Sequence, residues 1–127
     1  GQLKVAPCFL PGFFAGPYWI LDYDEQQGYA LISGGAPANQ GRDEGTCAPG
    51  SDVNDAGTWI FTRCPHPSSE LLEEVTRIAR DGFKLDVSVL NPVSHHPQCR
   101  YGLAGEDYEA MVDALAERGC EAGNTAQ

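Results

Sequence analysis

The chain has 127 residues, which is enough for one small domain or for one domain with an appendage. Its 18 acidic and 8 basic residues give a formal net charge of −10, which repels nucleic acid and anionic lipid surfaces, so nucleic acid is not expected as a partner. No apolar run approaches the ~20 residues that span a bilayer, so no transmembrane segment is predicted and a soluble or peripheral protein is expected.

The first third of the chain predicts a short strand followed by a hairpin. Apolar and polar residues alternate in the segment 2–9 until Pro7 ends the strand. Residues 18–23 (YWILDY) are rich in aromatic and branched side chains. The polar turn 24–28 (DEQQG) then returns the chain into a further strand at 29–33 (YALIS).

A long insertion separates this hairpin from a fourth strand. Residues 34–57 are rich in glycine, contain Cys47 and far exceed the length of an ordinary hairpin loop. Residues 58–63 (TWIFTR) then resume a strand, which Pro65 ends. Together the four strands predict an antiparallel meander.

Two helices and one more strand are predicted after the meander. Ser68 or Ser69 can cap the first helix, and Gly82 lies just past its end. Residues 85–90 (LDVSVL) alternate strictly and predict a last short strand, and an acidic first turn favours a second helix over 106–118. The apolar positions of the first helix recur every three or four residues, namely Leu71, Leu72, Val75, Ile78 and Ala79.

The order of these elements and several short sequence motifs resemble those of one known family. These motifs are LKV followed by a Pro/Gly/Phe-rich link, YWILDYDEQQGYALIS, and TWIFTR followed by a capped helix that ends in Gly-Phe. Over residues 2–90 they resemble the fifth to eighth strands and the packing helix of lipocalins of the apolipoprotein D and bacterial outer-membrane group.

The lipocalin resemblance implies a mostly β fold with helices. It is an antiparallel up-and-down meander from the second half of an eight-stranded barrel, with one packing helix and one extra C-terminal helix. The half-barrel domain would occupy residues 1–103, including the insertion 34–57. A helical appendage would occupy residues 104–127.

The Gly-rich insertion with its cysteine, together with a cysteine soon after the last strand, is most similar to the chloroplast lipocalins of plants and algae. Those are soluble proteins of the thylakoid lumen, linked to protecting thylakoid lipids from oxidation. Five cysteines without a C-x-x-C pair also favour long-range disulfides and an oxidising compartment.

The chloroplast resemblance implies a disulfide between Cys47 and Cys99. Cys8 is the next candidate partner for either of these two cysteines. Cys64 could simply be buried, and Cys120 could be the free or intermolecular thiol that an odd number of cysteines requires.

The resembled part begins at the fifth strand, so the first four strands and their Gly-x-Trp fingerprint are not in this chain. Small closed barrels need about eight strands, and an unclosed sheet leaves open edges. We therefore expect a partner protein that supplies the missing strands or covers the open edge. Arg63 stands where the family has an arginine that packs across the first-strand tryptophan, which implies a structural role.

The cavity of a lipocalin is lined by alternating strand residues, and this defines a candidate ligand site. The site would hold a lipid, a chlorophyll or other pigment, or a carotenoid by shape, without a covalent cofactor. In the alternative interpretation the same side chains only fill a core or pack on the helix. The candidate ligand-binding residues are Trp19, Leu21, Tyr29, Leu31, Trp59 and Phe61.

Neither catalysis nor a metal site is predicted. The sequence holds no Gly-x-Ser-x-Gly, no P-loop, no His-Glu-x-x-His and no dinucleotide fingerprint. The three histidines lack a coordinating cysteine pair, and the acidic residues around the turn 24–28 lack the spacing of a calcium loop.

A second hypothesis is a structural subunit rather than a ligand carrier. In it, the half-barrel caps the lumenal face of a membrane complex such as a photosystem with its antenna. The helix at 106–118 lies beyond the resembled part and has an apolar stripe of its own, so we expect it to dock on a partner or on the open sheet edge.

Overall fold

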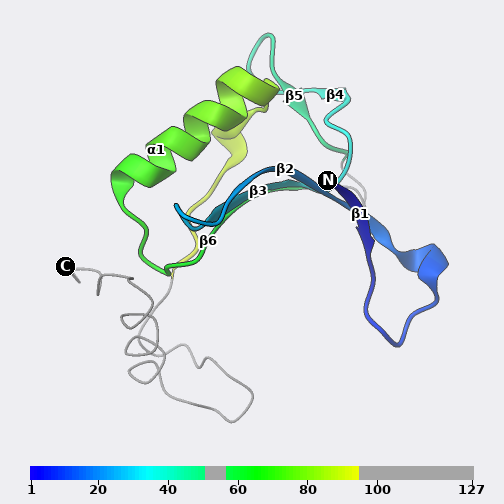
Figure 1. The fold of residues 1–127 in the computed structure, drawn as a ribbon. Coiled ribbons are helices and arrows are strands. Elements are labelled where there is room, and N and C mark those ends of the chain that lie inside the picture. Colours follow the sequence, from blue (N-terminus) through cyan, green and yellow to red (C-terminus); the bar gives the residue numbers. More distant parts are fainter. Residues whose placement is uncertain (51–56, 95–127) are drawn as a thin grey trace.

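Four antiparallel strands form a curved sheet with one helix on its convex face in the computed structural model, which describes residues 1–50 and 57–94 (Figure 1). The strands are β1 (Gln2–Val5), β2 (Gly16–Asp24), β3 (Tyr29–Ser33) and β6 (Thr58–Thr62), and they neighbour one another in that order. The predicted antiparallel meander is confirmed. The sheet is not closed: within the described residues, β1 and β6 each pair along one side only.

Some of the predictions lie outside the described residues. These are the second helix over 106–118, the appendage at 104–127, and the parts of the chain that carry Cys99, Cys120, His95 and His96.

The turn between β2 and β3 forms as predicted and also anchors the end of β6. The Asp24 carboxylate accepts a hydrogen bond from the Gln27 amide at 2.8 Å, and the Gly28 amide donates to the Asp24 carbonyl at 2.9 Å. Gly28 adopts φ +75, a conformation that glycine reaches without steric cost. Its carbonyl accepts from the amide of Arg63 at 2.7 Å, so Arg63 secures the turn to the sheet through its backbone.

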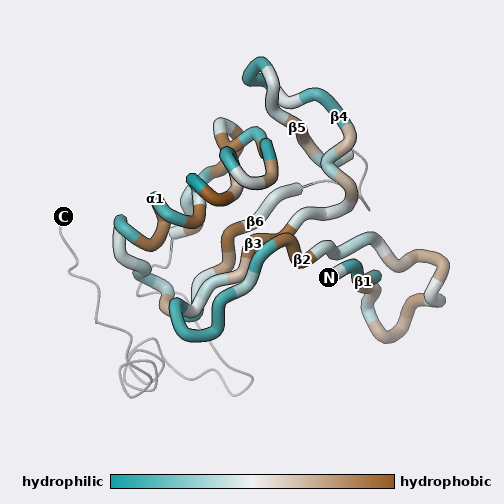
Figure 2. Tube along the Cα trace, turned by 45° about the horizontal axis from the view of Figure 1, so that its top comes forward, coloured by the Kyte–Doolittle hydropathy of each residue, from teal (hydrophilic) through white to brown (hydrophobic). Residues whose placement is uncertain are grey.

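The predicted helix is α1 (Ser69–Arg77), and it continues into a π-helical turn at Ile78–Gly82. Ser68 is the N-cap, since its hydroxyl accepts from the Leu71 amide at 3.2 Å. Figure 2 shows the apolar segments concentrated in α1 and in the middle of β2, β3 and β6. The buried core joins them through Tyr29, Leu31, Val75, Ala79 and Leu85.

The insertion is not a plain loop, because it contains a small second sheet. Strands β4 (Asn39–Gln40) and β5 (Cys47–Ala48) pair antiparallel. The chain after α1 then joins this sheet: the Cys47 amide donates to the Lys84 carbonyl at 2.6 Å, and the Asp86 amide donates to the Cys47 carbonyl at 2.9 Å. The insertion and the end of the helical segment are therefore held together.

The prediction of a last strand at 85–90 is wrong. Leu85 makes only an isolated parallel bridge to Cys47, and Val87–Val89 form a 3-10 turn. The Asp86 carboxylate accepts from the amide and the hydroxyl of Ser88, and this local bond closes the turn in place of an extended strand. Leu85 and Asp86 are buried in succession, so burial does not follow the alternation of the sequence.

The predicted disulfide between Cys47 and Cys99 is also wrong, because Cys47 is a free thiol. The backbone of Cys47 forms the isolated bridge to Leu85, at the place where the insertion meets the segment after α1. Cys8 is likewise free, and it is exposed. Among the three cysteines of the described residues, Cys64, directly after β6, is disulfide-bonded.

The Asp86 carboxylate is the polar link between the insertion and the segment after α1. It is buried, and Oδ2 accepts from the Arg42 amide at 2.6 Å. The hydrogen bond from the Ser88 side chain, together with those from the Arg42 and Ser88 amides, lowers the pKa of Asp86 from its usual 3.8.

A lowered carboxyl pKa in the folded state means that Asp86 stabilises the fold above pH 3.8 and loses this effect as the pH falls through its folded pKa. Asp86→Asn should therefore be less stable than the wild type at neutral pH, and the difference should shrink as the medium becomes more acidic than pH 3.8. Urea denaturation across this range measures it. Asp43→Asn, at an exposed position of the same insertion, is the matched control.

Candidate functional site

The strand pairing divides the sheet into two faces, and only one of them packs on α1. Residues opposite one another in an antiparallel pair point to the same face, and successive residues alternate. Tyr29 and Leu31 face α1, as their packing against Val75 and Ala79 shows. Ala30 therefore points to the other face.

The face turned away from α1 carries nine side chains and all of them are apolar or aromatic. The register assigns them: Ile20 and Trp59 both pair with Ile32, and Tyr23 and Phe61 both pair with Ala30. We call this surface the open face. Its residues are Leu3, Val5, Tyr18, Ile20, Tyr23, Ala30, Ile32, Trp59 and Phe61.

The open face is the concave side of the sheet. Figure 1 shows the strands bowing towards α1, and no other described element lies beneath them on the far side. Leu3, Val5, Tyr23, Trp59 and Phe61 are all exposed, and Phe61 at 48% is typical of them. Ile32 in the centre is only 1% exposed, so the surface has a packed middle and an open rim. A large exposed apolar patch on a protein marks an interaction site.

A bulge in β2 decides which of its residues reach the open face. The register shifts between Ile20 and Asp22, so Leu21 is the extra residue. Tyr18 and Ile20 point to the open face before the bulge, and Tyr23 does so after it. The bulge keeps the carboxylates of β2 off the open face.

The structure does not bring the six predicted ligand-binding residues to one surface. Trp59 and Phe61 lie on the open face, whereas Tyr29 and Leu31 are buried under α1, and Leu21 packs against the same core. These last three fill the core, which is the alternative interpretation of the sequence. Trp19 pairs with Ser33 and lies on the α1 side of the sheet.

Sequence reasoning missed seven residues of the open face. β1 and β2 contribute five of the seven. In β2, Tyr18 and Ile20 are the sequence neighbours of the predicted Trp19 and Leu21, so an error of one position in the alternation selects the wrong face of the sheet. The apolar stripe of α1 could have identified Leu31 as a core residue, but the bulge left no sign in the sequence. The missed residues are Leu3, Val5, Tyr18, Ile20, Tyr23, Ala30 and Ile32.

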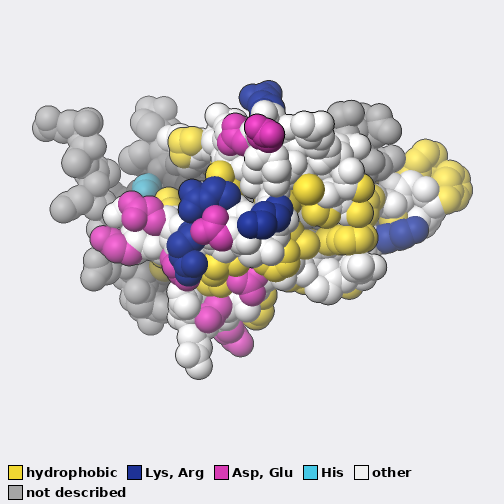
Figure 3. Space-filling model, turned by 90° about the horizontal axis from the view of Figure 1, so that it is seen from above, with side chains coloured by type: hydrophobic (Ala, Val, Ile, Leu, Met, Phe, Trp, Pro, Cys, Tyr) yellow, Lys and Arg dark blue, Asp and Glu magenta, His cyan; other side chains and the backbone are white. Residues whose placement is uncertain are grey.

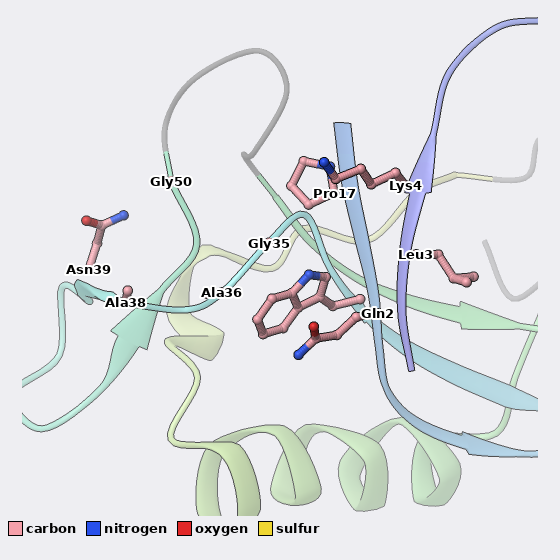
Figure 4. A pocket seen from close by; sticks show the side chains of 10 residues that line it. Gln2, Leu3, Lys4, Pro17, Gly35, Ala36, Ala38, Asn39 and Gly50 are labelled. Atoms are coloured by element: carbon pink, nitrogen blue, oxygen red, sulfur yellow. The ribbon is translucent and has the colours of Figure 1, made fainter. Parts of the chain in front are cut away.

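A second concave region lies on the α1 side, beside the insertion. It is a groove of about 700 Å³ between the β1–β2 ladder and the segment that follows β3. Figure 4 shows Gln2, Lys4 and Pro17 on one wall and Ala36 and Asn39 on the other. Trp19 also lines this groove. Its lining mixes an ammonium and amides with apolar carbons, unlike the open face, whose side chains are apolar or aromatic.

Tyr29 makes the polar contact at the edge of the core. Its hydroxyl donates to Asp22 Oδ2 at 2.8 Å. Burial, then the hydrogen bond to Asp22 and the nearby negative charges, raise the pKa of Tyr29 from 10.0 to about 12. The phenol stays protonated at neutral pH and acts as a hydrogen-bond donor that ties β2 to β3.

A raised phenol pKa stabilises the fold below pH 10, and this stabilisation is lost as the pH rises from 10 to about 12. Tyr29→Phe should lower the free energy of unfolding by about 1 kcal/mol at neutral pH, the typical net value of one hydrogen bond. The variant should also lose stability less steeply in alkali. Denaturation curves at several alkaline pH values measure both effects, and Tyr23→Phe, on the open face, is the matched control.

Within residues 1–50 and 57–94 no three His, Cys, Asp or Glu side chains gather as metal ligands. No helix of this described part is long and apolar enough to cross a bilayer. Neither a protein-family model, nor a curated protein, nor a solved structure matches the chain.

Proposed function

We propose that the open face binds a lipophilic molecule and that the chain works as a non-catalytic, lipocalin-like module. The observation that carries this proposal is the composition of the face: nine residues from four strands, without a charged side chain among them, on the concave side of the sheet. Ligand sites of this class are concave and lined by apolar and aromatic side chains.

The arrangement of the elements supports the lipocalin part of the proposal. An up-and-down meander is followed by a helix on its convex face, as the sequence resemblance implied. The occupant would be a fatty acyl chain, a chlorophyll or other pigment, or a carotenoid, since the phenol hydroxyls of Tyr18 and Tyr23 and the indole N–H of Trp59 are the only polar groups among the nine side chains of the face. The disulfide at Cys64 supports an oxidising compartment, of which the thylakoid lumen is the one that the resemblance suggests.

The two tryptophans of the chain allow a test, because they lie on opposite faces of the sheet. Trp19→Phe leaves Trp59 on the open face, and Trp59→Phe leaves Trp19 in the groove. Titration with a brominated fatty acid, whose bromine quenches indole on contact, should quench Trp59 and spare Trp19.

Each outcome of this titration has a definite meaning. Saturable quenching of Trp59 supports the proposal. The substitution Phe61→Ser should then weaken the binding of the fatty acid that this quenching reports. Quenching of Trp19 alone would move the ligand to the groove and overturn the assignment. No quenching in either variant would also reject lipophile binding.

A second function is favoured by the outer sides of β1 and β6, which pair with no other strand of residues 1–50 and 57–94. Exposed strand edges are templates for pairing with another chain. In this alternative, strands of a partner protein complete the sheet, and the module is a structural subunit of a larger assembly, such as a complex on the lumenal side of the thylakoid membrane. If sedimentation shows a folded monomer with a cooperative melt, the purified chain needs no such partner and this alternative fails.

A further inference from the structure

The loop between β1 and β2 exposes a cluster of large apolar side chains that the open face does not include. We call residues 6–15 the Phe loop. Phe9 and Phe13 are each 81% exposed, and Leu10 and Phe14 are exposed beside them. Figure 1 shows the loop projecting past the end of the sheet, and Figure 3 shows apolar side chains gathered at that end of the molecule.

The Phe loop is shaped by its own backbone. The Leu10 amide donates to the Pro7 carbonyl at 2.9 Å, and the Phe14 amide donates to the Pro11 carbonyl at 3.0 Å. The turn at Gly12–Phe14 is a 3-10 helix, and the rings of Phe13 and Phe14 lie 4.4 Å apart between centroids. Prolines with fixed φ begin both turns, so the loop presents its rings without a large loss of entropy on binding.

The charge pattern around the loop fits one kind of surface. No charged residue occurs between Val5 and Leu21, and Lys4 is the cation at the base of the loop. The chain as a whole carries a net charge of −10. An anionic membrane would therefore repel the protein, whereas a zwitterionic lipid surface would not.

The area of the cluster also favours lipid over a folded partner. Three phenylalanines and one leucine at these exposures offer on the order of 500 Å², from ~150–250 Å² for each aromatic side chain. A stable protein interface needs ~800 Å² from each partner. Insertion to ~5–10 Å into the headgroup boundary, by contrast, requires only a small projecting apolar tip.

We propose that the Phe loop docks this protein on a zwitterionic lipid surface by inserting Phe9, Leu10, Phe13 and Phe14. This docking goes beyond ligand binding on the open face, since the two surfaces share no residue. Docking holds the module on a bilayer. The open face could then take a lipophilic molecule from that bilayer or return one to it.

Flotation with phosphatidylcholine vesicles tests the proposal. The wild-type protein should float with them, and less of it should float when phosphatidylserine replaces part of the lipid. Phe9→Ser and Phe13→Ser should each lower the partition coefficient by about tenfold, since each removes one inserted ring. Phe83→Ser is the matched control, because Phe83 is exposed but lies after α1 and far along the chain from the loop.

A second variant reports insertion directly. In a background with Trp19→Phe and Trp59→Phe, Phe13→Trp should keep vesicle binding, and its emission should shift to shorter wavelength when vesicles are added. Circular dichroism checks that each variant is folded. An indole that enters the bilayer leaves water, so an unshifted spectrum contradicts insertion.

Three results would overturn the docking proposal. They are wild-type protein that stays in the aqueous fraction, serine variants that float as well as the wild type, and a Phe13-dependent dimer in sedimentation that ignores vesicles. The last result would make the occupant a second copy of the chain. Serine variants that lose flotation but keep Trp59 quenching would separate docking from ligand binding.

Discussion

Leu31→Ala should lower the free energy of unfolding by about 3 kcal/mol, the middle of the range for a buried leucine replaced by alanine. Leu31 is fully buried at the centre of the core, between the sheet and α1. The substitution leaves a cavity against Val75 and Ala79, whose positions are fixed by the capped helix. Urea denaturation followed by circular dichroism measures the loss, at an unchanged m-value.

Phe61→Ala is the contrasting variant on the other face. It removes a larger side chain, but Phe61 is 48% exposed on the open face, so the loss of stability should stay below about 1 kcal/mol. Equal losses for the two variants would contradict the division of the sheet into a packed face and an open one.

Gly41→Ala should lower the free energy of unfolding by about 2 kcal/mol, because there is no room for a methyl group at this position. A Cβ there would overlap Thr46 Oγ1 and would lie 2.8 Å from the Cβ of Asp86. The Gly41 amide also donates to the Thr46 carbonyl at 2.9 Å. The backbone must shift, and this weakens the join between the insertion and the segment after α1.

Gly82→Ala is the matched control for this second variant. An added Cβ at Gly82 meets nothing within 4 Å, and the residue ends the π-helical turn. Alanine in a helical position should leave stability unchanged or raise it by up to about 1 kcal/mol. Limited proteolysis should cut the insertion faster in Gly41→Ala only, and equal cutting of both variants would contradict the steric argument.

The strands and the helix were predictable from the sequence because each carries its own local signal. The turn around Asp24 and Gly28 and the cap at Ser68 need only neighbouring residues, and the structure confirms them. The order of the strands in the sheet follows, since short connections make consecutive strands neighbours.

The assignment of side chains to the two faces was not predictable, since it depends on pairing between strands. One extra residue at Leu21 changes the alternation of β2 relative to β3. Six ligand-binding residues chosen for size and aromatic character therefore divided between the core, the groove and the open face. Only Trp59 and Phe61 of that set reach the open face.

The environment of Cys47 was not predictable either. The bonds that hold it run to Lys84 and Asp86, almost forty residues later in the chain, and no local pattern encodes them. Because of these contacts, residues 85–90 form a bridge and a turn instead of the predicted strand. The long Gly-rich segment indicated an insertion, but its small sheet became visible only in three dimensions.

The bulge in β2 stores one residue that the pairing with β3 does not use. Ile20 lies opposite Ile32 and Asp22 lies opposite Leu31, so deleting Leu21 would make the strand alternate regularly and leave every other side chain on its present face. The deletion would cost only the contact of Leu21 with the core. Among variants of this protein, the loss of this one codon should therefore be tolerated better than the loss of a codon from the regularly alternating β3.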